Sequence, residues 1–240
     1  MPLHVSRIRA ICFDVDGTLS DTDDVIVDRL TRLLRPLRFL FPGRNARRAA
    51  RRLVMASEAP GNFIISLPDR IGIDAELASL ADWIARRTGR KPGKFRIMAG
   101  VKPMLAELSR RYPLAVVSAR DARTTGAFLE QFHLTGSFRC VATAQTCRHT
   151  KPFPDPILWA AQQMGVPVEA CLMVGDTTVD IRAGRSAGAQ TVGVLCGFGE
   201  EPELRRRGAD MILSETAELA QVLEADPPKS RGRVRGKKTP

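Results

Sequence analysis

From residue 97 onward, short apolar runs alternate with longer stretches whose apolar residues recur at helical spacing. The apolar runs predict strands over residues 8–13, 114–118, 141–144, 170–176, 190–195 and 209–213. The helical spacing predicts helices over residues 101–111, 122–132, 155–164 and 178–187. Because strands that alternate with helices form βαβ units, the chain is predicted to be an α/β protein with a doubly wound parallel sheet.

Two of the predicted strands end in carboxylates. Asp14 and Asp16 follow the first strand, whereas Asp176 ends the strand near residue 175 and Asp180 lies on the first turn of the next helix. Parallel strands present their carboxyl ends at one edge of a sheet, so these side chains are expected to converge there. Carboxylates that close repel one another, and a hard divalent cation with oxygen ligands would relieve the repulsion.

Two further polar residues are predicted to lie at the same edge. Ser118 ends the strand over residues 114–118, and Lys151 follows the strand over residues 141–144. Taken alone, a serine at a strand end is typical of a turn or helix cap, a role that Asp121 fits equally well. A lone lysine is typical of a solvated surface. The two residues therefore gain a functional interpretation only together with the aspartates.

The order of these motifs resembles a known family. D-x-D-G-T over residues 14–18, then Ser118, then Lys151 followed by P-x-P, and G-D-x-x-x-D over residues 175–180 match the haloacid dehalogenase-like hydrolase superfamily. The resemblance covers about residues 7–20 and 97–224. It implies that Asp14 is a nucleophile forming an aspartyl-phosphate and that Asp16 is the general acid and base. An aspartate at position 16 favours a phosphatase or a phosphomutase within this superfamily.

The same resemblance implies a magnesium cofactor. Asp14, Asp176 and the backbone carbonyl of Asp16 would hold Mg²⁺, while Asp180 would order the surroundings of the metal or brace Lys151. Ser118 and Lys151 would bind phosphoryl oxygens. The predicted activity is hydrolysis of a small phosphorylated metabolite. Phosphoglycolate phosphatase-like members are the nearest resemblance, since residues 19–22 are similar to their L-x-D-S/T segment.

Two alternative functions remain open from the sequence. A beta-phosphoglucomutase-like enzyme would carry the same motifs but return the phosphoryl group to a bound sugar phosphate instead of water. A protein of a different class would keep the fold and use its basic tail to bind nucleic acid or a membrane. The intact aspartates and Lys151 favour an enzyme over this second alternative.

Residues 21–96 differ from the rest of the chain, because they show helical spacing interrupted by prolines. An insert at this place resembles the helical cap domain of the superfamily, and the same resemblance implies hinges near residues 20–22 and 98–100. Residues 1–20 and 97–224 would then form the core domain, and residues 225–240 a basic disordered tail. Such a cap would close over the site and select the substrate.

The formal net charge of +11 is concentrated in arginines between residues 29 and 52 and in the tail. The arginine segment is interpreted as a solvated helix face, as a trap for an anionic substrate, or as a basic amphipathic helix at a membrane or partner surface. Because no aromatic residue accompanies the tail's charges, no specific nucleic-acid binding is expected.

The five cysteines form no C-x-x-C pair and predict no disulfide framework. Cys140, Cys147 and His149 lack a fourth ligand, so no zinc site is predicted. The sequence shows no secretory signal and no long apolar run, and a cytoplasmic location is expected. The oligomeric state stays open.

Overall fold

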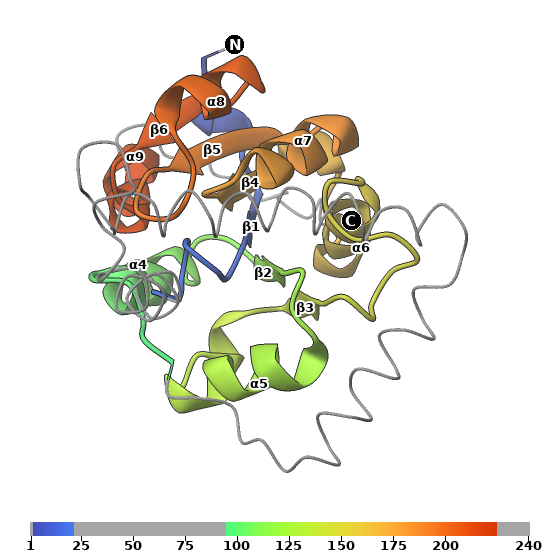
Figure 1. The fold of residues 1–240 in the computed structure, drawn as a ribbon, viewed down its shortest axis with the longest axis vertical. Helices are drawn as coiled ribbons and strands as arrows, with labels where there is room; N and C mark the ends of the chain where they lie inside the picture. Colours follow the sequence, from blue (N-terminus) through green and yellow to red (C-terminus); the bar gives the residue numbers. More distant parts are fainter. Residues whose placement is uncertain (1, 22–94, 225–240) are drawn as a thin grey trace, which may run out of the picture.

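The structure is a computed structural model that describes residues 2–21 and 95–224. Its centre is a six-stranded, entirely parallel sheet in the order β3-β2-β1-β4-β5-β6 (Figure 1). The strands are β1 (Ala10–Phe13), β2 (Leu114–Val117), β3 (Cys140–Ala142), β4 (Cys171–Gly175), β5 (Gln190–Val194) and β6 (Met211–Leu213). All six lie within or overlap the predicted runs, and the predicted α/β fold class is confirmed.

Strand β1 lies in the middle of the sheet and pairs with β2 on one side and β4 on the other. Ile11, for example, is in register with Leu114 of β2 and with Leu172 of β4. From β1 the chain first builds the sheet outward through β2 and β3, and then returns to build it the other way from β4. The boundary between β1 and β4 is therefore the topological switch point, where open α/β sheets bind their ligands.

Helices cover both faces of the sheet (Figure 1). They are α4 (Val101–Leu108), α5 (Ala122–Gln131), α6 (Asp155–Met164), α7 (Thr178–Ala187), α8 (Glu201–Arg206) and α9 (Leu219–Glu224). Short 3-10 helices occupy connections at η1 (Val5–Arg7), η4 (Thr135–Ser137), η5 (Val168–Ala170) and η6 (Thr216–Glu218). The bounds of α6 and α7 agree with those predicted, α4 and α5 end earlier, and α8 and α9 were not predicted.

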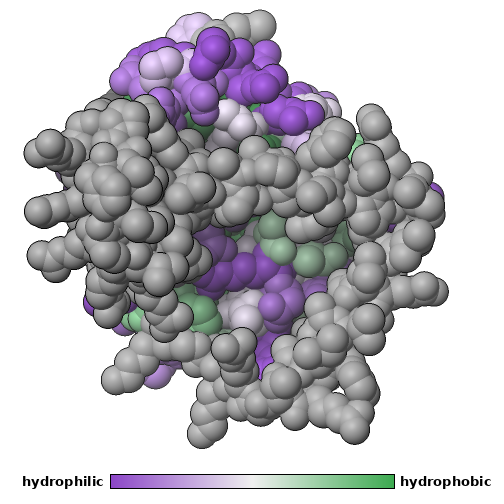
Figure 2. All heavy atoms as spheres, in the orientation of Figure 1, coloured by the Kyte–Doolittle hydropathy of each residue, from purple (hydrophilic) through white to green (hydrophobic). Residues whose placement is uncertain are grey.

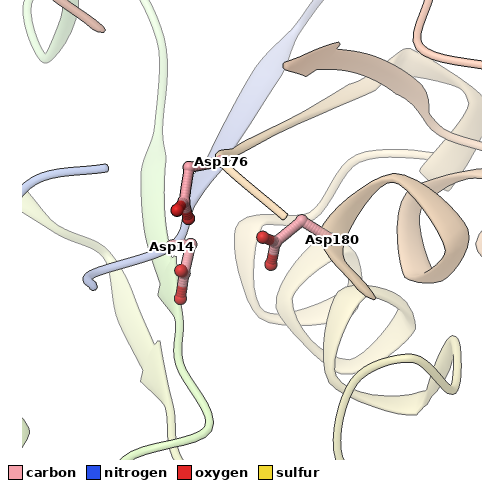
Figure 3. Close-up of side chains that lie close together, drawn as sticks. All are labelled: Asp14, Asp176 and Asp180. Carbon is pink, nitrogen blue, oxygen red and sulfur yellow. The ribbon is translucent and has the colours of Figure 1, made fainter. Parts of the chain in front are cut away.

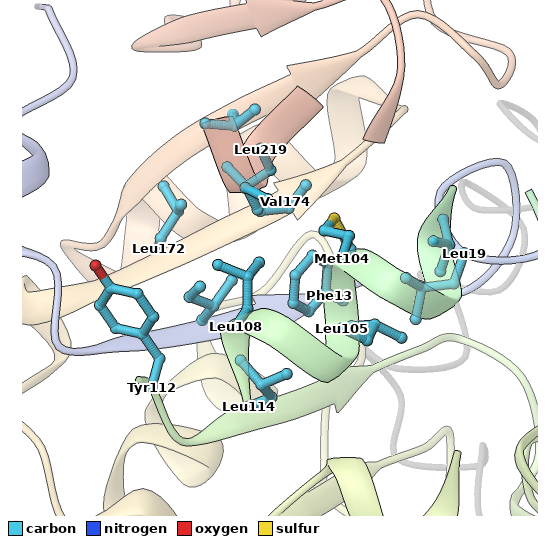
Figure 4. Close-up of a cluster of buried hydrophobic side chains, with 14 of the residues drawn as sticks. Phe13, Leu19, Met104, Leu105, Leu108, Tyr112, Leu114, Leu172, Val174 and Leu219 are labelled. Carbon is cyan, nitrogen blue, oxygen red and sulfur yellow. The ribbon is translucent and has the colours of Figure 1, made fainter. Parts of the chain in front are cut away.

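The side chains of the central strands β1, β2 and β4 alternate between two cores. Ile11 and Phe13 belong to the larger core, which also contains the buried residues of α4 and α9 (Figure 4). Ala10 and Cys12 belong to a second core with α6 and α7, which is rich in alanine. Because both faces are buried, the strands read as continuous apolar runs in the sequence. This two-sided burial holds the carboxyl edge of the sheet in place.

The described segments on either side of residues 22–94 pair with each other. The Asp21 N–H donates to the Arg96 carbonyl at 3.0 Å, and the Met98 N–H donates to the Leu19 carbonyl at 3.0 Å. The chain therefore leaves the core and returns to it at adjacent points. Apart from Asp21 and residues 95–96, the cap domain predicted over residues 21–96, including its arginine segment, lies outside the described residues, as does the predicted tail.

Among the residues that the structure describes, no helix is long and apolar enough to cross a membrane. The longest described helices, such as α6 and α7, instead pack an apolar face onto the sheet.

Candidate active site

Asp14 follows β1 directly and is held at the switch point by its own backbone. Its N–H donates to the Val174 carbonyl of β4 at 2.9 Å, which continues the pairing of the two strands by one residue. Its carboxylate is buried, and Oδ1 accepts a hydrogen bond from Lys151 Nζ at 2.6 Å. Lys151 comes from the loop after β3, so the contact joins residues that are 137 positions apart.

Lys151 is itself buried and contacts a second carboxylate. Its Nζ donates to Asp180 Oδ1 at 2.6 Å, while Asp180 Oδ2 accepts from the N–H and the hydroxyl of Thr177 at 3.1 and 2.7 Å. The bond from the Thr177 N–H is one half of a capping box at the start of α7, and the Asp180 N–H, which donates to the Thr177 side chain, makes the other half. Asp180 therefore both begins a helix and holds Lys151 against Asp14.

Asp176 lies at the end of β4 and is fully buried. Its Oδ2 accepts the Phe198 N–H at 2.7 Å, and its Oδ1 accepts the hydroxyl of Thr18 at 3.4 Å. Figure 3 shows the carboxylates of Asp14, Asp176 and Asp180 gathered in one place, and each offers a ligand oxygen within 4.8 Å of the others. The tertiary structure therefore brings together three of the predicted aspartates.

This acidic group has the chemistry of a magnesium site. All three side chains offer carboxylate oxygens, the ligands that Mg²⁺ prefers. Lys151 offsets one of the three negative charges, so a divalent cation would balance the remaining two. Within the described residues, the side chain of Asp16 does not belong to this group.

Burial also changes the protonation of the nucleophile candidate. Burial, reinforced by the charges of Asp180 and Asp16 and opposed by Lys151, raises the pKa of Asp14 to about 7. The Lys151 ammonium behaves differently: although burial disfavours its charge, Asp14 and Asp180 hold its pKa above the ordinary value. Lys151 is therefore a permanent cation, while Asp14 is held in a site that favours a further positive charge.

Asp16 has a partner that the sequence analysis did not identify. The Arg120 guanidinium donates to both of its oxygens, from Nε to Oδ2 at 2.6 Å and from Nη2 to Oδ1. The guanidinium carbon also lies 5.2 Å from the ring centre of Phe95 and 5.9 Å from that of Phe128. An arginine just after a predicted strand end was the available signal, but nothing in the sequence connects it to Asp16.

Ser118 lies at the carboxyl end of β2, with its hydroxyl accepting the Arg120 N–H at 3.1 Å. It does not cap the next helix, because the Asp121 side chain accepts the Thr124 N–H at 2.9 Å and so caps α5. Ser118 thus lies at the same edge of the sheet as the aspartates. In Figure 2, hydrophilic residues lie near the middle of the face in view and along its top.

A doubly wound parallel sheet with buried carboxylates and a lysine at its switch point defines an α/β enzyme site. The sequence matches the family described as haloacid dehalogenase-like hydrolase over residues 11–194. The chain therefore belongs to the haloacid dehalogenase-like hydrolases, as its motifs predicted, and is an enzyme.

Individual relatives agree with this assignment. The chain is 31% identical over 218 residues to a probable phosphatase, IndB, of Dickeya dadantii, covering 90% of this chain and 93% of that protein. It is 27% identical over 224 residues to a phosphoglycolate phosphatase of Nitrosococcus oceani, covering 89% and 95%. A solved structure of a HAD family hydrolase from Deinococcus radiodurans, with bound phosphate and sodium, is similar with a TM-score of 0.64 at 25% identity, covering 92% and 97%.

Proposed function

We propose that this protein is a magnesium-dependent phosphatase that hydrolyses a small phosphorylated metabolite through an aspartyl-phosphate on Asp14. The observation that carries the proposal is the convergence of Asp14, Lys151, Asp176 and Asp180 at the switch point of the sheet. The names of the relatives, which include a probable phosphatase and a phosphoglycolate phosphatase, support phosphate monoesters as the substrate class.

In the first half of the proposed reaction, an oxygen of the Asp14 carboxylate attacks phosphorus and the bond to the ester oxygen breaks. The departing oxygen takes a proton from Asp16. Lys151, which donates to Asp14 and Asp180, would bind a phosphoryl oxygen as negative charge develops, and the Ser118 hydroxyl would donate to another. The product of this half is a phosphorylated Asp14 and a free alcohol.

In the second half, water attacks the phosphorus while Asp16 removes its proton, and the bond between phosphorus and Asp14 breaks to release inorganic phosphate. Asp16 is paired with Arg120 as a carboxylate, the form that this second half requires. To act first as an acid, it must be protonated and leave at least one of the two hydrogen bonds. Arg120 therefore holds Asp16 in the state that precedes water activation.

Asp14, Asp176 and the carbonyl of Asp16 would hold Mg²⁺, and Asp180 would keep Lys151 in place beside it. When bound, the ion neutralises negative charge on the phosphoryl group. A divalent cation beside Asp14 would favour the ionised carboxylate that attacks phosphorus and would oppose the burial that raises its pKa to about 7.

The test is phosphate release from a panel of phosphorylated small metabolites, with and without Mg²⁺. We expect release that requires Mg²⁺ and disappears in Asp14→Asn, because the amide is not a nucleophile. Glu130→Gln, which removes an exposed carboxylate on α5, is the matched control and should retain activity. Undiminished activity in Asp14→Asn would refute the proposed nucleophile.

The same panel distinguishes hydrolysis from transfer of the phosphoryl group back to a bound sugar phosphate. A phosphomutase would interconvert sugar phosphates with little net phosphate release, whereas a phosphatase releases one phosphate for each substrate consumed. Following substrate and phosphate together therefore distinguishes the two enzymes that share these motifs. A protein that only binds nucleic acid or membranes would show neither reaction.

A further inference from the structure

The loop after β5 lies directly against Asp176. A Cβ atom built on Gly197 would lie 2.1 Å from Asp176 Oδ2, and one built on Gly199 would lie 1.9 Å from the Asp176 backbone oxygen. Both distances are far below 3.0 Å, and real Cβ atoms essentially never lie that close to a non-bonded atom. The loop therefore approaches Asp176 so closely that glycine is required at both positions.

Between these two glycines, Phe198 provides a hydrogen bond to the same carboxylate. Its backbone N–H donates to Asp176 Oδ2 at 2.7 Å, a distance typical of a bond to an ionised acceptor. Phe198 is only 5% exposed, so this N–H belongs to a buried residue of the loop. The carboxylate is thus fixed by a backbone donor from a loop 22 residues away.

The loop is also connected to the turn that follows Asp16. Cys196 Sγ lies 3.3 Å from the Gly17 carbonyl oxygen and 3.4 Å from Oγ1 of Thr216 in η6, whose hydroxyl donates to the Thr18 carbonyl at 2.7 Å. The loop after β5, the turn that carries the D-x-D-G-T motif and the end of β4 consequently form one contiguous cluster. A shift of the loop would be transmitted to Asp176.

We propose that the segment of residues 196–199 is a positioning element that orients Asp176 for metal binding. The inference rests on the proposed function, since it assigns Asp176 to the Mg²⁺ site. Groups that hydrogen-bond a ligating carboxylate restrict its rotation and raise the affinity for the metal. By holding Oδ2 with a backbone N–H, the segment restricts the directions in which the carboxylate can offer its oxygens.

The first test is Mg²⁺ binding by isothermal titration calorimetry to the wild-type protein, Gly197→Ala and a matched control. In Gly197→Ala the new methyl group would occupy the place of Oδ2 and displace the carboxylate. The control is Gly126→Ala on α5, where nothing lies within 4 Å of the added Cβ. We expect Gly197→Ala to weaken binding by about 10-fold or more and the control to bind like wild type.

Two further readouts separate positioning from a general loss of structure. The melting temperature without Mg²⁺ should show a folded Gly197→Ala variant, and saturating Mg²⁺ should restore most of its kcat. The Mg²⁺ concentration for half-maximal activity should rise by about 10-fold. Wild-type affinity in a folded Gly197→Ala variant would overturn the inference, whereas a wild-type protein that binds no Mg²⁺ would instead refute the metal dependence of the proposed function.

A second experiment tests the hydrogen bond from the Phe198 N–H to Asp176 and does not require Gly197→Ala to fold. Hydrogen exchange of the Phe198 amide is compared between wild type and Asp176→Ala, with the Leu195 amide, which donates to the Leu213 carbonyl at 3.0 Å, as the internal control. We expect Phe198 exchange to accelerate by about 10-fold or more in the variant, since its acceptor is removed. Unchanged exchange at Phe198 would overturn the inference.

Discussion

The guanidinium of Arg120 donates hydrogen bonds to both carboxylate oxygens of Asp16, although the two residues are 104 positions apart. The Arg120 side chain is only 13% exposed and lies near two phenylalanine rings, which restrict its movement. A planar fork that spans both oxygens fixes the orientation of a carboxylate better than a single donor does. The general acid and base of the proposed reaction is therefore oriented by a residue outside the recognised motifs.

Replacement of Arg120 tests this relationship. Arg120→Ala should lower kcat/KM by about 10-fold or more, because Asp16 loses both hydrogen bonds that orient it. Arg120→Lys should recover only part of the activity, since one ammonium does not reproduce the fork. Steady-state kinetics on the best substrate of the panel measure both effects. Arg139→Ala, at an exposed arginine, is the control, and equal activities in all variants would contradict the prediction.

Removal of the buried cation Lys151 should destabilise the protein in the absence of metal. In Lys151→Met, Asp14 and Asp180 lose their shared partner, at a cost of about 3 kcal/mol in the free energy of unfolding. Added Mg²⁺ should restore part of this loss, because it supplies positive charge to the same carboxylates. Urea unfolding with and without Mg²⁺ measures both changes.

The control for this variant is Lys102→Met, at an exposed position on α4. Substitution there should change the free energy of unfolding by no more than about 0.5 kcal/mol. If Lys151→Met were no less stable than Lys102→Met, the buried ion pairs would contribute nothing to the metal-free fold.

The cap of α5 should make stability depend on pH. Although partial burial opposes it, hydrogen bonds from the hydroxyl and N–H of Thr124 hold the pKa of Asp121 below its ordinary value of 3.8. A depressed folded-state pKa contributes stability that is fully present above the unfolded value and is lost as pH falls through the folded one. The advantage of wild type over Asp121→Ala, about 1 kcal/mol near neutral pH, should therefore shrink below pH 3.8.

Unfolding of both proteins over a series of pH values measures this difference directly. Subtracting the two curves removes the titration of all other acids that the proteins share. A difference that stayed constant down to pH values well below 3.8 would show that the Asp121 charge does not contribute.

Two helical glycines should respond oppositely to alanine. Gly126 lies inside α5 with open space around a new Cβ, so Gly126→Ala should stabilise the protein by about 0.5–1 kcal/mol. Gly184 lies inside α7, where the Cβ would be 2.5 Å from Thr191 Cγ2, and Gly184→Ala should destabilise it by about 1–3 kcal/mol. Thermal or urea unfolding gives both values, and the same sign for both would contradict the packing described here.

The order of the elements was predictable because it depends on local patterns. Continuous apolar runs predict β1 and β4, and apolar residues at helical spacing predict α6 and α7. The short helices α8 and α9 escaped prediction, since six residues span less than two helical turns and carry little periodic signal. The doubly wound class of the sheet followed from the alternation of strands and helices, whereas the strand order was not predicted and is given by the tertiary structure.

The sequence also identified the carboxylates and Lys151 as site candidates, because each follows an apolar strand in a recognised motif. Their partners were decided only by the tertiary structure. Arg120 meets Asp16, and the loop of Gly197 and Phe198 meets Asp176, because parallel pairing brings separate strand ends to one edge. Contacts of this kind depend on how loops pack across the sheet, and local sequence patterns do not predict that packing.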